Sequence, residues 1–290
     1  MSEPAPPSLL DRLSTNLLKV LPQHLLAAGM YRLMRTETPW LKDLLIRQIS
    51  RRYGIEMTEA EQPDPAAYPS FNAFFTRRLR ADARPIAADQ VVAPADGRIS
   101  QIGRIDGERL LQAKGHRYEL DALLGADLHQ TEVFRDGLFA TIYLSPKDYH
   151  RVHIPLAGTL ESMVFIPGDL FSVSDATTQL VPNLFARNER VICHFDTARG
   201  PMAVILIGAI FVGSMETVWH GEVHGRRGEP TRWVYRADQR QKFATGDEIG
   251  RFNMGSTVIL LLPQGAAEWR ADLDAGKPVR MGEAIAALSD

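Results

Sequence analysis

The sequence predicts an α+β protein in which N-terminal amphipathic helices are followed by a β-rich domain of barrel- or sandwich-like architecture. Two observations support this. Residues 8–52 repeat apolar side chains at helical spacing, whereas from about residue 90 short apolar runs alternate with Gly, Pro and Asp. Between them, the polar stretch 56–70 contains several prolines and is interpreted as a linker. We therefore divide the chain into a helical region, 1–55, and a β-rich domain, 56–290.

Three helices are expected in the N-terminal region. Ser8 and Asp11 form an N-cap pattern for the first helix, which Pro22 ends. Thr38 and Pro39 open the third. Most polar positions are basic: Arg12, Lys19, Arg32, Arg35, Lys42, Arg47, Arg51 and Arg52. Apolar stripes facing basic ones suit helices lying on an anionic bilayer. They suit equally well helices packed against the core or a second subunit, and the pattern alone does not decide between these interpretations.

The remaining elements follow from shorter patterns. A short amphipathic helix is predicted over residues 71–80. Apolar runs predict strands at 91–93, 138–144, 160–165, 204–212 and 258–262. Turns centred on Gly97 and Gly158, with a third at 246–250, resemble those of hammerhead-like β-sandwich modules. Cys193 lies in an alternating, strand-like segment, which indicates a buried structural thiol.

Composition excludes several classes of protein. The net charge of −2 argues against an electrostatic nucleic-acid binder. A single cysteine excludes a disulfide framework and a cysteine-rich zinc site. No segment reaches the roughly 18–20 apolar residues of a transmembrane helix. The first residues lack the pattern of a signal peptide, so we expect the protein to stay in the compartment where it is made.

A serine directly follows a glycine just before a predicted apolar strand. Gly255 precedes Ser256, and residues 258–262 are wholly apolar. Because glycine has no Cβ, another group can approach its carbonyl closely. The Ser256 hydroxyl could then attack the carbonyl of Gly255 and form an ester by an N-to-O acyl shift. The alternative for so short a motif is an ordinary turn.

Two histidines and an aspartate are further candidates. His150 and His153 lie three residues apart, so an extended chain would direct their rings to opposite faces and favour different roles. They could also be structural, or bind a metal with His194 or Asp96, although no spacing favours a metal site. Asp96 precedes a glycine, so it is either a turn former or an acid that orients a histidine.

The chain order Asp96, His153, Ser256 also permits a serine hydrolase. Such an enzyme would use the three residues as an Asp-His-Ser triad. However, the Gly-x-Ser-x-Gly elbow is absent, because Thr257 and Val258 follow Ser256. Only residues 257–290 follow the serine, which is unusually late for a hydrolase nucleophile.

Taken together, these segments resemble the phosphatidylserine decarboxylase family from about Leu9 to Leu288. Gly255-Ser256-Thr257 matches the family's self-cleavage motif, with Met254 in place of a leucine of similar volume. Four further segments are similar to the family: 71–75, 94–97, 149–155 and 167–173. Each match is weak alone, but their order along one chain makes chance agreement improbable.

The resemblance implies a role for each candidate residue. Self-cleavage would separate 1–255 (the beta chain) from 256–290 (the alpha chain), and Ser256 would become a covalent pyruvoyl group. Asp96 and His153 would form a charge relay with Ser256, in which His153 takes the serine proton. His150 would protonate the carbanion or assist the Schiff base. The pyruvoyl group would form this Schiff base with phosphatidylserine, release CO2 and leave phosphatidylethanolamine.

The resemblance also implies cofactors, partners and location. The pyruvoyl group would replace pyridoxal phosphate, and no metal is expected. The two cleavage chains would form a heterodimer, and two such units a homodimer. A lipid substrate favours the membrane interpretation of residues 1–55, as a peripheral protein on the cytoplasmic side of the cell membrane.

Three rival functions differ in testable ways. A pyruvoyl enzyme for a soluble amino acid would have no use for basic amphipathic helices. A serine hydrolase would stay uncut. A biotinyl or lipoyl carrier needs an exposed lysine at a hairpin tip, and the turns near Gly97, Gly158 and Asp247 carry no such Met-Lys-Met or Asp-Lys-Ala sequence.

Overall fold

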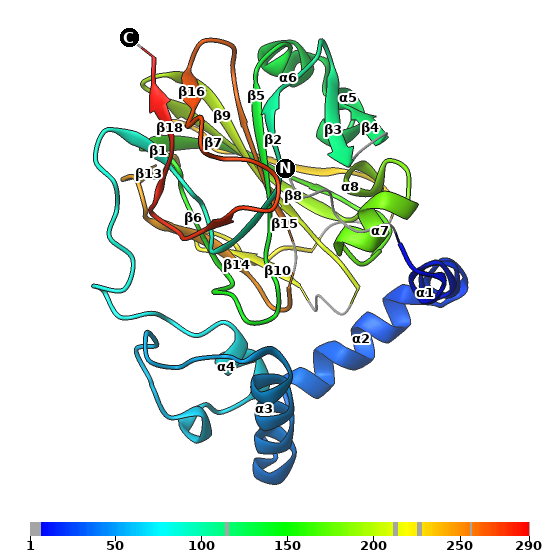
Figure 1. The fold of residues 1–290 in the computed structure, drawn as a ribbon. Helices are drawn as coiled ribbons and strands as arrows, with labels where there is room; N and C mark the ends of the chain where they lie inside the picture. Colours follow the sequence, from blue (N-terminus) through cyan, green and yellow to red (C-terminus); the bar gives the residue numbers. More distant parts are fainter. Residues whose placement is uncertain (1–6, 114–115, 211–213, 225–227, 256, 290) are drawn as a thin grey trace.

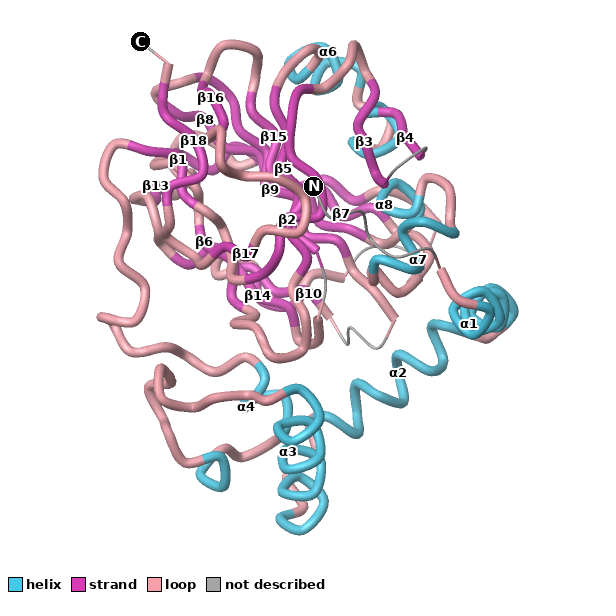
Figure 2. The backbone as a smooth tube through the Cα atoms, viewed as in Figure 1, coloured by secondary structure: helices cyan, strands magenta, loops and turns pink. Residues whose placement is uncertain are grey.

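A computed structural model describes residues 7–113, 116–210, 214–224, 228–255 and 257–289. It has an α+β architecture, with three N-terminal helices outside a body built mainly of strands, as Figures 1 and 2 show. The predicted fold class is confirmed. None of the helices in the described ranges is both long and apolar enough to cross a membrane. The boundary between residues 55 and 56 stays a prediction.

The N-terminal helices begin and end where local signals place them. They are α1 (Leu9–Val20), α2 (Gln23–Met34) and α3 (Pro39–Tyr53). Before α1, the Asp11 carboxylate accepts the Ser8 N–H at 2.8 Å, and the Ser8 hydroxyl accepts the Asp11 N–H at 3.2 Å. This confirms the predicted N-cap. Helix α3 has proline at its first position and ends at Gly54, whose φ of +65° closes a left-handed cap.

Helix α4 (Phe71–Phe75) is shorter than the predicted helix over 71–80. The Ser70 hydroxyl caps it by accepting the Ala73 N–H at 3.2 Å. Beyond Thr76 the chain becomes extended, because Leu79 forms a β-bridge with Ala60. The prediction was wrong about the end of this helix, since pairing with a distant segment overrides the local pattern.

The body contains the remaining elements. The short helices are η1 (Pro65–Ala67), α5 (Leu120–Leu124), α6 (Leu128–Phe134), α7 (Asp175–Leu180) and α8 (Leu184–Arg187). The first nine strands are β1 (Gln90–Val92), β2 (Gly97–Arg104), β3 (Arg109–Ala113), β4 (His116–Glu119), β5 (Leu138–Tyr143), β6 (Arg151–His153), β7 (Gly158–Ile166), β8 (Arg190–Thr197) and β9 (Gly200–Ile207). The others are β10 (Met215–Thr217), β11 (Gly221–Glu222), β12 (Thr231–Val234), β13 (Lys242–Phe243), β14 (Glu248–Phe252), β15 (Thr257–Leu262), β16 (Ala267–Trp269), β17 (Pro278–Val279) and β18 (Ala284–Leu288).

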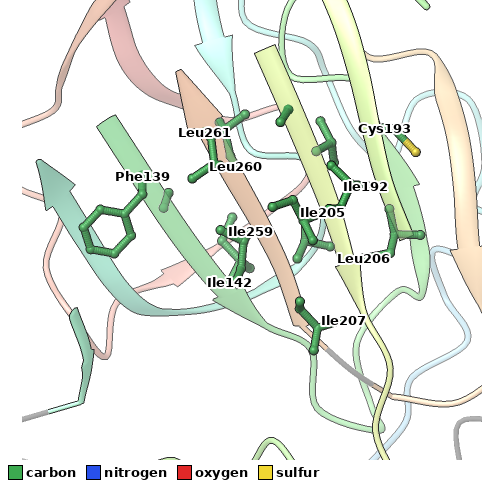
Figure 3. Close-up of a cluster of buried hydrophobic side chains, with 14 of the residues drawn as sticks. Phe139, Ile142, Ile192, Cys193, Ile205, Leu206, Ile207, Ile259, Leu260 and Leu261 are labelled. Atoms are coloured by element: carbon green, nitrogen blue, oxygen red, sulfur yellow. The ribbon is translucent and has the colours of Figure 1, made fainter. Parts of the chain in front are cut away.

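Strand β15 lies in the middle of the largest sheet. Among the described strands this sheet has the open order β12-β7-β8-β9-β15-β5-β2-β17, with β13 added beside β7. Every residue of β15 is buried, as its uninterrupted apolar sequence predicts. Figure 3 shows its side chains with those of β5, β8 and β9 in one cluster, which includes the fully buried thiol of Cys193. This confirms the predicted burial of the thiol, and burial raises the pKa of Cys193.

A second sheet brings the two candidate histidines to the segment before Gly255. Its order is β11-β10-β14-β6, and β6 pairs antiparallel with β14. In this register His153 lies opposite Glu248, and Arg151 lies opposite Arg251. Strand β14 ends three residues before Gly255. The remaining strands form a sheet of order β1-β18-β16 and the pair β3-β4.

A small second core lies beside the main one and joins the N-terminal helices to the segment that follows them. Met34, Ile46, Tyr68 and the phenylalanines of α4 form this second cluster, and Met254 packs against both cores. Several large apolar side chains of α1–α3 face outward instead. They are Leu9, Leu13, Leu25, Trp40 and Leu44, with exposed fractions between 40% and 79%.

Candidate active site

His150 is a buried imidazole with one free nitrogen. Its Nδ1 lies 2.8 Å from the carbonyl oxygen of Asp148, which can only accept, so Nδ1 carries the proton. Its Nε2 is buried and has no hydrogen-bond partner among the described residues. The ring packs on Phe75, with 4.0 Å between centroids. Burial lowers the pKa of His150 to about 3, so the ring is neutral and Nε2 offers a lone pair.

Gly255 lies directly beside this nitrogen. A Cβ atom at Gly255 would be 3.3 Å from His150 Nε2 and 3.3 Å from the carbonyl oxygen of Leu144. The absence of a side chain therefore lets the backbone approach the imidazole, as argued for glycine from the sequence. Ser256 itself lies outside the described residues. Thr257, which opens β15, has a buried hydroxyl without a partner in the described ranges.

His153 has both ring nitrogens engaged. Its Nδ1 donates to the carbonyl oxygen of Gly246 at 2.7 Å, so Nε2 accepts from the Tyr149 hydroxyl at 3.0 Å. Its backbone N–H donates to Pro94 at 2.8 Å, which places it beside the segment that carries Asp96. Burial lowers the pKa of His153, although the hydrogen bond to Gly246 opposes this shift.

The Asp96 carboxylate is held by groups other than His153. Oδ1 and Oδ2 accept from Arg84 at 2.9 and 2.5 Å, and Oδ1 also accepts the Met281 N–H at 2.8 Å. Arg84 bonds to Glu59 as well, at 2.9 Å. Burial alone would lower the pKa of Arg84, but the hydrogen bonds to Asp96 and Glu59 raise it above the ordinary arginine value. Asp96 and His153 are neighbours, and in the described part of the chain their side chains share no hydrogen bond.

The structure thus places His150 against Gly255. It also places Asp96 close to His153. Asp96 follows a proline and an alanine at the start of β2, so it is also the turn residue expected from its sequence. Tyr149 and Arg84 were not among the predicted site residues. Tyr149 directly precedes His150, so its position could have indicated that it belongs to the site. Nothing in the sequence around Arg84 predicts its pairing with Asp96. Among the described residues no group of three or more His, Cys, Asp or Glu is arranged to hold a metal.

Comparisons with known proteins give a consistent match along the chain. A family model described as phosphatidylserine decarboxylase matches residues 71–287, and a second, described as PSD, matches residues 13–54. Three curated relatives are each called phosphatidylserine decarboxylase proenzyme. That of Marinobacter nauticus is 51% identical over 97% of this chain and 99% of its own length. That of Methylococcus capsulatus is 55% identical over 91% and 92%, and that of Nitrosococcus oceani is 53% identical over 93% and 89%.

Proposed function

The chain belongs to the phosphatidylserine decarboxylase family, and we propose that it is a proenzyme that cuts itself at Gly255–Ser256 and then converts phosphatidylserine to phosphatidylethanolamine. As a member of this family it is a decarboxylase, a carboxy-lyase. The observation that carries the proposal is the site at the cleavage motif. A buried imidazole, whose Nε2 has no hydrogen-bond partner among the described residues, lies against Gly255 in a segment that matches the family.

Self-cleavage proceeds through an ester. The Ser256 Oγ attacks the carbonyl carbon of Gly255, the bond from this carbon to the Ser256 nitrogen breaks, and that nitrogen takes a proton. Elimination then removes the Ser256 Cα proton to a base and breaks the bond between Cβ and Oγ, so Gly255 leaves as a carboxylate and residue 256 becomes dehydroalanine. One water hydrolyses its imine tautomer, and ammonia leaves. The new alpha chain, 256–290, then begins with a pyruvoyl group.

His153 and Asp96 serve this first reaction. A neutral imidazole can accept the Ser256 proton, and the lowered pKa of His153 keeps it neutral. The charge of Asp96 opposes that lowering, so it favours the protonated ring that forms during the attack. To act as the base, His153 Nε2 must exchange its hydrogen bond with Tyr149 for one with Ser256.

His150 serves the second reaction. A pyruvoyl group supplies the ketone for a Schiff base with the substrate amine and an electron sink for the carbanion left by CO2. The free Nε2 of His150 accepts a proton as the amine adds and returns it to the carbanion. The site fits this group, because the imidazole beside residue 255 is buried and neutral, and its Nε2 has no partner in the part of the chain that the structure describes. No metal or pyridoxal phosphate enters the proposal.

The two cleavage chains would stay together as a heterodimer. Strand β15 lies between β9 and β5, and β17 and β18 pair with β2 and β1. Every strand of the alpha chain therefore lies in a sheet with strands of the beta chain or pairs with one that does. The proposal includes a homodimer of these units, as expected from the family.

The helices α1–α3 would bind the membrane. Their exposed apolar side chains, Leu9, Leu13, Leu25, Trp40 and Leu44, could enter the interface of a bilayer. Nearby basic residues would attract the anionic substrate. We place the protein on the cytoplasmic side of the cell membrane as a peripheral protein.

The deciding measurement is the intact mass of the purified protein under denaturing conditions. Two chains that separate at Gly255–Ser256, the smaller lighter by one ammonia than a serine-initiated chain, would support the proposal. The Ser256→Ala variant provides the uncut control. A single uncut chain from wild-type protein that forms phosphatidylethanolamine would rule out the pyruvoyl mechanism. Labelling of an uncut chain by a serine-directed fluorophosphonate would favour the serine hydrolase.

A further inference from the structure

A cavity of about 380 Å³ lies beside α4, between residues 61–78 and the strands β6 and β14. Four arginines line it: Arg77 and Arg78 after α4, Arg151 on β6 and Arg251 on β14. Figure 1 shows α4 between α3 and the body. The pairing of β6 with β14 brings Arg151 opposite Arg251, so the fold gathers arginines that are far apart in the sequence.

Two of these arginines have buried N–H groups without partners. The Arg77 side chain donates from Nη2 to the carbonyl oxygen of Lys147 at 3.2 Å, but its Nε and Nη1 have no partner in the described ranges. Arg77 is only 5% exposed. Arg251 pairs through Nη2 with Glu216, and its buried Nε has no partner there either. Because a guanidinium keeps its charge in proteins, unpaired buried donors of this kind are costly and fit an anion.

The charges around the cavity leave a positive excess. Arg151 is neutralised by Glu248 at 2.7 Å, and Arg251 by Glu216. Within the described part of the chain, Arg77 forms no ion pair with a carboxylate. Burial lowers the pKa of Arg77, and the charges of Asp96 and Asp148 oppose this shift without reversing it. Glu61 adds one carboxylate to the lining of the cavity, but this residue is exposed to solvent.

Helix α4 contacts both this cavity and the cleavage site. Phe75 packs on the ring of His150, while Ala73 and Asn72 line the cavity. The Asn72 side-chain amide donates to Asn253, two residues before Gly255, at 3.1 Å. A ligand bound by the arginines would therefore lie next to the segment that carries His150, since Arg151 directly follows this histidine and lines the cavity.

We propose that this arginine cavity binds the phosphodiester of the phospholipid headgroup. The inference rests on the proposed function, and it names residues that hold the substrate. Phosphate fits better than the substrate carboxylate. Decarboxylation removes the carboxylate charge, so an arginine bound to it would stabilise the ground state more than the transition state. The phosphodiester keeps its charge throughout, and the guanidinium fork matches its oxygens.

The test uses three variants and one matched control. Arg77→Lys keeps the charge but removes the fork, and Arg77→Gln and Arg251→Gln remove one charge each. Arg240→Gln is the control, because Arg240 is also ion-paired, to Glu161 at 3.0 Å, and does not line the cavity. Each protein is assayed for the extent of self-cleavage, and for kcat and KM with phosphatidylserine in mixed micelles. Inorganic phosphate is titrated by calorimetry into the uncut Ser256→Ala protein carrying the same changes, and tested as a competitor of phosphatidylserine.

We expect KM to rise at least about tenfold in Arg77→Gln and Arg251→Gln, because binding shared by ground and transition state is lost. Arg77→Lys should be intermediate. Self-cleavage and kcat should not change, and phosphate should compete with the lipid. Unchanged KM in both cavity variants would overturn the inference. So would a fall in kcat and cleavage at constant KM, since Arg77 would then only hold the loop at Lys147.

The two sources of phosphate are also distinguishable. If the cavity variants lose phosphate binding but keep their KM, the cavity binds free phosphate and the headgroup assignment is wrong. If wild-type protein does not decarboxylate phosphatidylserine at all, the proposed function fails. Calorimetry on the uncut chain still tests the anion site in that case: loss of binding in the variants supports it, and equal binding overturns it.

Discussion

The His150 and His153 regions of the site differ sharply, although only two residues separate them. His150 directs Nε2, which has no partner among the residues that the structure describes, at Gly255 and is stacked on an aromatic ring. Both nitrogens of His153 are hydrogen-bonded, and its neighbours are Tyr149, Gly246 and the charge of Asp96. When Nε2 of the first ring accepts a proton, it has no hydrogen bond to a described residue to break, whereas Nε2 of the second ring must first release Tyr149.

This difference suggests that the two reactions of the chain need different environments. Self-cleavage happens once per molecule, so a base that has to exchange hydrogen bonds is tolerable. Decarboxylation recurs at every turnover, so a permanently free lone pair is an advantage. The comparison makes separable predictions for the two histidines.

The largest effect is expected for His153→Ala. Loss of a general base typically costs about 100-fold or more in rate, so self-cleavage should become at least about 100-fold slower. Without the pyruvoyl group, decarboxylation should be lost too. A time course of intact mass after cell-free synthesis measures this directly, with thermal unfolding as the check on folding. If His153→Ala cuts at the wild-type rate and His150→Ala does not, the roles are reversed and the free nitrogen beside Gly255 is the base.

His150→Ala should affect only the second reaction. The protein should cut itself normally, because Asp96 and His153 are untouched, but kcat for decarboxylation should fall by about 100-fold. The measurement is CO2 release per pyruvoyl-containing chain. His194→Ala is the matched control, since His194 is also a buried histidine with a pKa lowered to about 4, but lies on β8. Equal losses in both variants would indicate a packing defect rather than chemistry.

Much of this arrangement could be predicted from the sequence because it depends on local patterns. The cap at Ser8, the break at Pro22 and the buried strand after Ser256 follow from residue type and spacing. The hydrogen-bond partners could not be predicted in this way. No sequence motif links Arg84 to Asp96, although the two side chains are paired. The contact between Tyr149 and His153 likewise depends on the fold.

The arginine cavity shows the same limit. Arg151 and Arg251 are a hundred residues apart, and only the register of β6 with β14 brings them together. The early end of α4 has the same cause, since Leu79 pairs with Ala60. Long-range pairing, rather than local preference, determines these features.

The pH dependence of stability should report the two histidines separately. His150 has a folded pKa of about 3 against an ordinary value of 6.5, and the pKa of His153 is also lowered. The unfolded chain binds protons first as pH falls, so stability is complete above pH 6.5 and declines below it. Each buried histidine contributes a slope of about 1.4 kcal/mol per pH unit. Urea unfolding from pH 7.5 to 4.5 measures this slope.

In that experiment the His150→Gln substitution should remove the contribution of His150 to the slope of stability against pH. This should hold over the whole measured pH range. His153→Gln should remove less at the acid end, since the charge of Asp96 and the bond to Gly246 oppose the lowering of its pKa. Unchanged slopes in both variants would show that these rings take up protons in the folded protein as readily as in the unfolded chain, so that their pKa values are not lowered. This result would contradict the proposed difference between the environments of His150 and His153.

The smallest effect is expected for Tyr149→Phe, which removes the hydroxyl that occupies His153 Nε2. A neutral hydrogen bond is worth about 1 kcal/mol, so freeing this nitrogen should speed self-cleavage by up to about fivefold. The same loss should lower the free energy of unfolding by about 1 kcal/mol. The half-time of cleavage measures the first effect, and Tyr118→Phe, at another buried tyrosine, is the control. Slower cleavage would mean that Tyr149 orients His153 for the attack, and that the occupied nitrogen is part of the active arrangement rather than an obstacle to it.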